Sequence, residues 1–339
     1  MVKRNNGVDL FRLIAAFFII LVHTNYYNLN NTIVENIRIS ARWALPYFFI
    51  CSGYFLYKKI KNKRFVEFID IEKSILKLIS ILIISGLIYF LLDTLIQNRR
   101  PFRIETILIG TYFHLWFIGS LIFGFLCIWY IFKIGKEKFL TIISLVILIF
   151  VFFSGSYRNF VNIKTSFDFF RFLISIPLLF IGMQVAKYSL SRRYFVFVLL
   201  SLLAGFYLQF VEVDYLHINF KVNRFEHEIL VGTIISAAAI FWLTSMVTIP
   251  DNRFSTWGKN YSLFIYLYHP LTLFLIEIIL NMTDSKVGTQ LLTFKPIIGF
   301  ILTLSFAIIL NNHFASMFQI LNGDFHVINR KNFLSKSEL

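Results

Sequence analysis

Two residues of the first apolar segment could do chemistry inside a membrane. Arg12 and His23 lie eleven residues apart in the otherwise apolar run GVDLFRLIAAFFIILVHTN. In an α-helix this spacing places both side chains on one face, separated by about 16 Å along the axis. Asp9 precedes Arg12 by three residues and is well placed to form an ion pair with it. Because charged groups inside a span are costly and usually face an interior cavity, we expect this face to line a passage. The simpler alternatives are an interfacial anchor for Arg12 and a histidine at the membrane surface for His23.

A second polar face lies in the stretch GKNYSLFIYLYHPL. Ser262, Tyr266 and His269 stand at positions i, i+4 and i+7, which share one helical face. Pro270 follows directly, and a proline there frees a backbone carbonyl and bends the helix toward a cavity. A neutral histidine in a dry pocket is the usual general base for a hydroxyl group. These residues predict a transmembrane cavity with acid–base chemistry, which would serve acyl transfer or proton-coupled transport.

Two further stretches carry polar residues into apolar surroundings. RWALPYFFICSGYFL begins at Arg42 and contains Ser52 and Gly53, a small pair that predicts a close approach between helices. YFHLWFIGSL contains His114 and Trp116 at the expected outer end of a span. Tryptophan is expected at a membrane interface, whereas histidine is not.

The remaining charged residues inside spans are weaker candidates. Glu228 and Glu277 lie in or beside apolar runs, and a transporter could use them to handle protons. Asp168 and Arg171 have the i, i+3 spacing of a structural ion pair.

The elements that must position these residues follow from composition. The 339 residues are 58% hydrophobic and only 15% charged, whereas soluble domains are about 45–50% apolar and about 25% charged. Apolar stretches of about 20 residues, the length that crosses a bilayer, recur along the chain. We therefore expect an all-α polytopic transmembrane helical bundle of about ten spans: 8–25, 43–57, 74–95, 114–133, 139–154, 168–186, 194–211, 229–248, 260–281 and 293–312.

The distribution of basic residues predicts the orientation of these spans. If both termini are cytoplasmic, the inner segments hold 19 lysines and arginines and the outer segments 11, in line with the positive-inside rule. Residues 1–320 then form one integral-membrane domain with an uncleaved first span, and 321–339 form a cytoplasmic C-terminal tail. The excess of basic residues outside would suit contact with lipid headgroups or an anionic extracellular partner. Membrane topology thus explains the net charge of +15, and we expect no nucleic-acid partner.

Several kinds of site are not predicted by the sequence. Cys51 and Cys127 lie in apolar runs, where they read as small buried hydrophobic residues. There is no Cys/His spacing suited to zinc, no glycine-rich phosphate loop and no GxSxG elbow. We therefore predict no metal site.

Five stretches in this order resemble the acyltransferase-3 family of bacterial integral-membrane acyltransferases. Within that family the chain is most similar to the branch of stand-alone polysaccharide O-acetyltransferases, which also holds the membrane half of the vancomycin-resistance serine racemases. The matching stretches are the R-x10-H pattern at Arg12–His23, FFICSGYFL (Phe48–Leu56), HLWFI (His114–Ile118), PLLFIGM (Pro177–Met183) and SLFIYLYHP (Ser262–Pro270).

The resemblance implies transfer of an acyl group, usually acetyl, from cytoplasmic acyl-CoA to a hydroxyl of a cell-envelope glycan or lipid-linked sugar. The protein would lie in the bacterial cytoplasmic membrane and hold no permanently bound cofactor, with acetyl-CoA as donor substrate. It would complete the transfer itself or pass the acyl group to another protein. A transporter of a small polar solute such as serine, and a non-catalytic scaffold, are the alternatives.

The expected roles follow from that reaction. His23 would be the catalytic base, assisted by His269 and Tyr266. The positive charge for the anionic donor would come from Arg12, Lys58, Lys59, Lys73 and Lys77, although the positive-inside rule alone also explains the lysines. The acceptor would contact His114, Trp116, Arg42 and Ser52.

Overall fold

Long apolar helices make up most of the chain in the computed structural model. The residues that the structure describes are 5–24, 31–63, 66–96, 110–161, 170–188, 192–224, 227–282 and 292–325. Within them, eight helical segments are long and apolar enough to cross a membrane. Two shorter helices of the described residues, α3 and α12, run through the same bundle, and we call these ten segments together its passes. The passes are α1 (Asn6–His23), α3 (Ala44–Ile60), α4 (Ile69–Leu95), α6 (Trp116–Lys133), α7 (Leu140–Ser154), α9 (Phe170–Leu173) continuing into α10 (Ser175–Lys187), α11 (Phe195–Phe220), α12 (Val231–Met246), α13 (Arg253–Asn281) and α15 (Lys295–His313).

Each expected span has a counterpart among these helices, so the predicted all-α polytopic bundle is confirmed. In the part of the chain that the structure describes, three α-helices lie outside the expected spans: α2 (Asn31–Ala41), α8 (Arg158–Val161) and α16 (Ala315–Leu321). The amphipathic helix α2 falls in a segment that we expected to be an outer loop. It buries Val34, Ile39 and Ala41, and the backbone carbonyl of Ile39 accepts a hydrogen bond from Gln209 of α11 at 3.0 Å.

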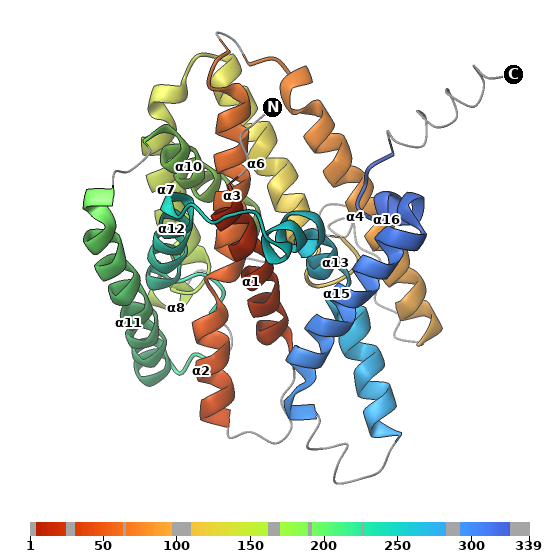
Figure 1. Ribbon diagram of the computed structural model, residues 1–339. Helices are drawn as coiled ribbons and strands as arrows, with labels where there is room; N and C mark the ends of the chain where they lie inside the picture. The colour runs from red at the N-terminus through yellow and green to blue at the C-terminus, as the bar shows by residue number, and fades with distance from the viewer. Residues whose placement is uncertain are drawn as a thin grey trace, which may run out of the picture.

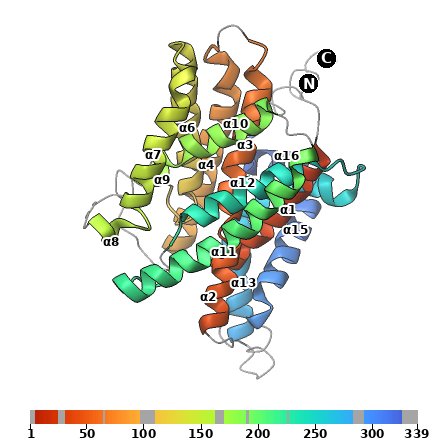
Figure 2. The same ribbon diagram turned by 90° about the vertical axis from the view of Figure 1, so that its left-hand side faces the viewer.

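Successive passes run in opposite directions, as the colour gradient in Figures 1 and 2 shows. We call the end of the bundle where α1 begins the Arg12 side and the end where α1 finishes the His23 side. The helix α1 lies in the interior and packs against α3, α12, α13 and α15, while α11 and α4 lie at opposite edges (Figure 1). The segment after α16 returns to the Arg12 side, where Asp324 pairs with Lys77 of α4 at 2.6 Å. Residues 326–339 of the expected tail lie outside the described residues.

The close approach predicted at Gly53 is confirmed. A methyl group added at Gly53 of α3 would lie 2.0 Å from the carbonyl oxygen of Leu179 in α10. Gly182 of α10 faces α3 in the same way, because its added methyl group would lie 1.9 Å from the carbonyl oxygen of Ile50. Glycine at these positions lets two backbones touch, as it commonly does between membrane helices.

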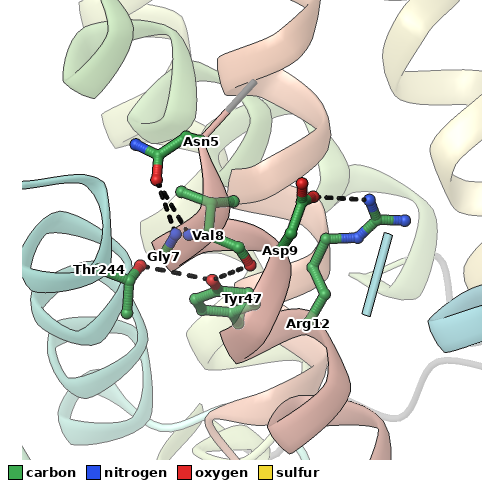
Figure 3. Close-up of polar contacts among 7 residues, drawn as sticks. All are labelled: Asn5, Gly7, Val8, Asp9, Arg12, Tyr47 and Thr244. Atoms are coloured by element: carbon green, nitrogen blue, oxygen red, sulfur yellow. Dashed lines mark hydrogen bonds and ion pairs between the residues drawn. The ribbon is translucent and has the colours of Figure 1, made fainter. Parts of the chain in front are cut away.

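Hydrogen bonds hold the beginning of α1 in place (Figure 3). The side chain of Asn5 accepts from the backbone N–H groups of Gly7 and Val8, which caps the helix. The buried hydroxyl of Tyr47 in α3 donates to the carbonyl oxygen of Val8 at 3.1 Å and lies 3.4 Å from the hydroxyl of Thr244 in α12. Three helices are therefore joined immediately before the turn that carries Asp9 and Arg12.

Candidate active site

A basic cavity opens beside α1 on the Arg12 side. Its volume is about 450 Å³, and its lining includes Arg12, Ser52, Lys59, Lys77 and Tyr266. The described lining holds three basic side chains and no carboxylate, so the cavity is suited to an anion. We call it the Arg12 cavity.

The expected ion pair of Arg12 is present. Its Nη1 atom lies 3.4 Å from Oδ1 of Asp9, and the Asp9 residue is only 3% exposed. In Figure 3 the Arg12 side chain points away from Tyr47, with Asp9 beside its guanidinium group. Asp9 therefore orients Arg12 while leaving it on the wall of the cavity.

Two of the four predicted lysines line the Arg12 cavity and two do not. Lys59 and Lys77 contribute to its wall. The Lys58 ammonium lies 4.2 Å from the centre of the Tyr54 ring, and Lys73 is also outside the described lining.

A second, smaller cavity lies on the His23 side. Its volume is about 70 Å³. This cavity is lined by five of the residues expected to act on or bind the acceptor: His23, Arg42, His114, Trp116 and Tyr266. We call it the His23 cavity. Two of the expected residues are absent from its described lining. One is His269, and the other is Ser52, which lines the Arg12 cavity instead and donates to the Phe48 carbonyl at 2.8 Å.

Three histidines gather at the His23 cavity. The ring of His23 stacks on that of His269 with centroids 5.5 Å apart, and the His114 ring lies 5.6 Å from His269. These residues come from α1, from α13 and from the turn before α6, so only the tertiary structure brings them together. His114 and His269 are almost fully buried.

Hydrogen bonds determine which nitrogen of each buried ring carries a proton. Nδ1 of His269 lies 2.8 Å from the Tyr266 carbonyl oxygen, and a carbonyl can only accept, so Nδ1 is protonated and Nε2 holds a lone pair. Nε2 of His114 donates in the same way to the Leu267 carbonyl at 3.0 Å. Nε2 of His269 and Nδ1 of His114 are buried, with no hydrogen-bond partner in the described part of the chain. Both are therefore available as proton acceptors.

Pro270 explains the orientation of His269. In a regular helix the N–H of residue 270 would bond to the carbonyl of Tyr266, but proline has no N–H group. The Nδ1–H group of His269 occupies that carbonyl instead. The His-Pro pair therefore sets the tautomer of the buried ring.

Tyr266 belongs to both cavities. It lines the Arg12 cavity and the His23 cavity, and its hydroxyl donates a hydrogen bond to the His114 carbonyl oxygen. The side chain thus stands between the basic space and the histidine cluster. Ser262, one turn earlier, is buried but lines neither cavity, and its hydroxyl has no hydrogen-bond partner among the described residues.

Glu228 has a larger place in the site than its sequence position suggested. It lines the His23 cavity and pairs with Arg171, whose Nε lies 2.9 Å from Oε2 of Glu228. The guanidinium of Arg171 also lies 5.6 Å from the centre of the Trp116 ring. Asp168, the predicted partner of Arg171, lies outside the described residues. Glu277, the other weaker candidate, pairs with Lys295 at 2.5 Å and contributes to neither cavity.

Within the described residues, no group of three or more His, Cys, Asp or Glu side chains is arranged to hold a metal ion. Cys51 and Cys127 are free thiols; Cys51 is buried as expected, whereas Cys127 is only half-buried. The arrangement can bind an anion at one end and accept a proton at the other.

Comparison with known proteins agrees with this architecture. The sequence profile of an acyltransferase domain, acyltransferase-3, matches residues 5–312. Two curated relatives are amino-acid racemases of Enterococcus faecalis. The first is 23% identical over 302 residues, which cover 82% of this chain and 42% of the relative. The second is 30% identical over 180 residues, which cover 50% of this chain and 24% of the relative. The chain thus spans less than half the length of these relatives, and no solved structure matches it.

Proposed function

We propose that this chain, which belongs to the acyltransferase-3 family of membrane acyltransferases, moves an acetyl group from acyl-CoA to a hydroxyl of a cell-envelope glycan or lipid-linked sugar. Its place would be the bacterial cytoplasmic membrane. The observation that carries the proposal is the pair of cavities with Tyr266 in common, one basic and one lined by histidine.

The Arg12 cavity suits the donor. Coenzyme A carries several phosphate charges, and Arg12, Lys59 and Lys77 offer donors for them. The pantetheine arm is long and thin, so it can extend from these charges toward Tyr266. In this proposal the thioester lies near Tyr266, which lines both cavities.

The His23 cavity suits activation of the acceptor. His23 takes the proton of the acceptor hydroxyl as the oxygen attacks the thioester carbonyl carbon. The carbon–sulfur bond breaks, the coenzyme leaves as a thiolate and a proton returns to its sulfur. His269, stacked on His23, and the Tyr266 hydroxyl between the cavities are the groups placed to assist proton transfer.

Export of a small polar solute such as serine is the competing function. The racemase relatives do not decide between the two, because their printed name describes proteins of which this chain matches less than half. The shared tyrosine favours acyl transfer, since a donor and an acceptor entering from opposite ends would meet there.

The test compares His23→Ala with the wild type, using purified protein in lipid nanodiscs. Release of free coenzyme A from acetyl-CoA is measured with a panel of cell-envelope glycans. Loss of a general base typically costs 10²–10⁴-fold, so we expect the rate of His23→Ala to fall by about 100-fold or more. His313→Ala is the matched control, because His313 is exposed at the end of α15.

Two results would overturn the proposal. One is a His23→Ala rate equal to that of the wild type. The other is wild-type protein that carries radiolabelled serine across proteoliposomes but never cleaves the thioester, which would establish the transport function instead.

A further inference from the structure

A third cavity adjoins the His23 cavity. Its volume is about 290 Å³, and it shares Arg42 and Glu228 with the smaller space. The rest of its polar wall comes from α8, the turn before it, α9 and the segment before α12. We call it the arginine cavity; its charged and titratable lining residues are Arg42, Arg158, Arg171, His227 and Glu228.

The described lining is strongly basic. Three arginines face this space with a single carboxylate, that of Glu228, and the carboxylate is bonded to Arg171. Ser156 and Asn159 add neutral polar groups. A concave, basic wall of this kind attracts anions and can bind their oxygens in bidentate fashion.

His227 points to a ligand independently of the arginines. The residue is only 2% exposed, and its side chain lines the cavity. Neither ring nitrogen has a hydrogen-bond partner among the described residues. Buried polar groups are normally paired. Burial, together with the charges of Arg42, Arg224 and His217, lowers the pKa of His227 to about 4. The ring is therefore neutral at pH 7 and keeps one N–H group to donate.

Size separates the functions of the two adjoining spaces. Pockets that enclose a small-molecule ligand usually measure about 300–1,000 Å³, so the His23 cavity at about 70 Å³ holds reacting groups and not a whole sugar. The arginine cavity at about 290 Å³ has room for a larger part of an acceptor. Arg42 and Glu228 line both spaces, so the arginine cavity lies next to the space that His23 lines.

We propose that the arginine cavity binds an oxyanion of the acceptor, a carboxylate or a phosphate, while the hydroxyl to be acylated reaches His23. The acceptor is thus an acidic glycan or a phosphate-bearing sugar. This inference rests on the proposed acyl transfer. Arg42 and Arg158 bind the oxyanion, and the N–H of His227 adds a donor.

The first arm measures binding alone. The thermal unfolding midpoint of the purified chain is followed with sodium phosphate, sodium glucuronate or neutral glucose, at constant ionic strength. We expect phosphate or glucuronate to raise the midpoint by a few degrees in the wild type, with no shift from glucose. Arg158→Gln should lose the shift. Lys221→Gln, which removes an equal charge from an exposed residue outside the described lining, should keep it.

The second arm measures transfer from acetyl-CoA to matched acceptors. The acceptors are a glucuronate-containing oligosaccharide, glucose phosphate and a neutral maltose oligosaccharide. Comparing them distinguishes recognition of a carboxylate from recognition of a phosphate. We expect kcat/KM to be at least 10-fold higher for one charged acceptor than for the neutral one. In Arg158→Gln the KM for that acceptor should rise by about 10-fold, and the preference should largely disappear.

The outcomes distinguish the two proposals. If wild-type protein acylates neutral and charged acceptors equally, or if Arg158→Gln and Lys221→Gln behave alike in both arms, the oxyanion site is wrong while acyl transfer stands. If no acceptor is acylated and acetyl-CoA is never cleaved, the proposed transfer is wrong. The oxyanion site is still supported in that case if anions raise the thermal unfolding midpoint and only Arg158→Gln loses this shift.

Discussion

Single residues of the site owe their chemistry to their immediate partners. His269 holds its proton on Nδ1 because Pro270 leaves the Tyr266 carbonyl without a backbone donor. Asp9, buried beside Arg12, keeps the guanidinium in place while leaving it on the cavity wall. Both effects depend on residues that are neighbours in sequence.

His227 gives a pH dependence that belongs to a single side chain. An unfolded histidine takes up a proton near pH 6.5, whereas the folded chain resists protonation of His227 down to about pH 4. The unfolded state therefore binds more protons in this interval, and the free energy of unfolding falls as the pH falls. We expect the midpoint of thermal unfolding to drop more between pH 7 and pH 5 in the wild type than in His227→Gln.

The measurement is a set of unfolding curves in one detergent at constant ionic strength. Because other groups also titrate, only the difference between the two proteins reports on His227. Equal slopes with pH in both proteins would show that His227 is not protected from protonation.

At the scale of elements, the crossing of α3 and α10 is a tight constraint near the site. We expect Gly53→Ala and Gly182→Ala to destabilise the protein strongly, because each new methyl group would overlap a carbonyl of the facing helix. Overpacking of this kind usually costs about 1–3 kcal/mol and occasionally more. Thermal unfolding followed by fluorescence-detected size exclusion measures the loss.

Gly86→Ala is the matched control. It lies inside α4. The atom nearest to a methyl group added there is the Thr111 hydroxyl oxygen, 3.7 Å away, which is an ordinary contact distance. Alanine also favours the helix by about 0.8–1.0 kcal/mol over glycine. If Gly86→Ala lowered the unfolding midpoint as much as Gly53→Ala, the loss at the crossing would not come from backbone contact.

At the scale of the whole molecule, the two ends of the bundle carry different numbers of basic residues. The positive-inside rule predicts that the Arg12 side faces the cytoplasm. We expect a membrane-impermeant maleimide to label Lys221→Cys in intact cells and Lys187→Cys only after permeabilisation. Both positions are exposed. Lys187 ends α10 and Lys221 directly follows α11, and these two passes run in opposite directions, so the two residues lie at opposite ends of the bundle.

The labelling background carries Cys51→Ala and Cys127→Ala, which removes the two native thiols. Cells expressing this background without a new cysteine give the baseline. If intact cells label Lys187→Cys and not Lys221→Cys, the predicted orientation is wrong. The proposed transfer would then run in the opposite direction.

The sequence by itself determined the features that depend on local spacing. Hydropathy predicted the all-α bundle because a bilayer of fixed thickness requires apolar runs of fixed length. The three-residue interval predicted the Asp9–Arg12 pair, which is present at 3.4 Å. Small residues predicted the close approach at Gly53, since only a missing side chain lets two backbones meet.

Only the tertiary structure decided which distant residues share a cavity. It placed Ser52 on the Arg12 cavity, kept Lys58 and Lys73 off its described lining, and joined Arg171 to Glu228. The arginine cavity combines residues from three separate parts of the chain, Arg42, Arg158 and His227. Periodicity states which side chains share one helical face, but the neighbour that each face meets depends on the packing of all the helices together.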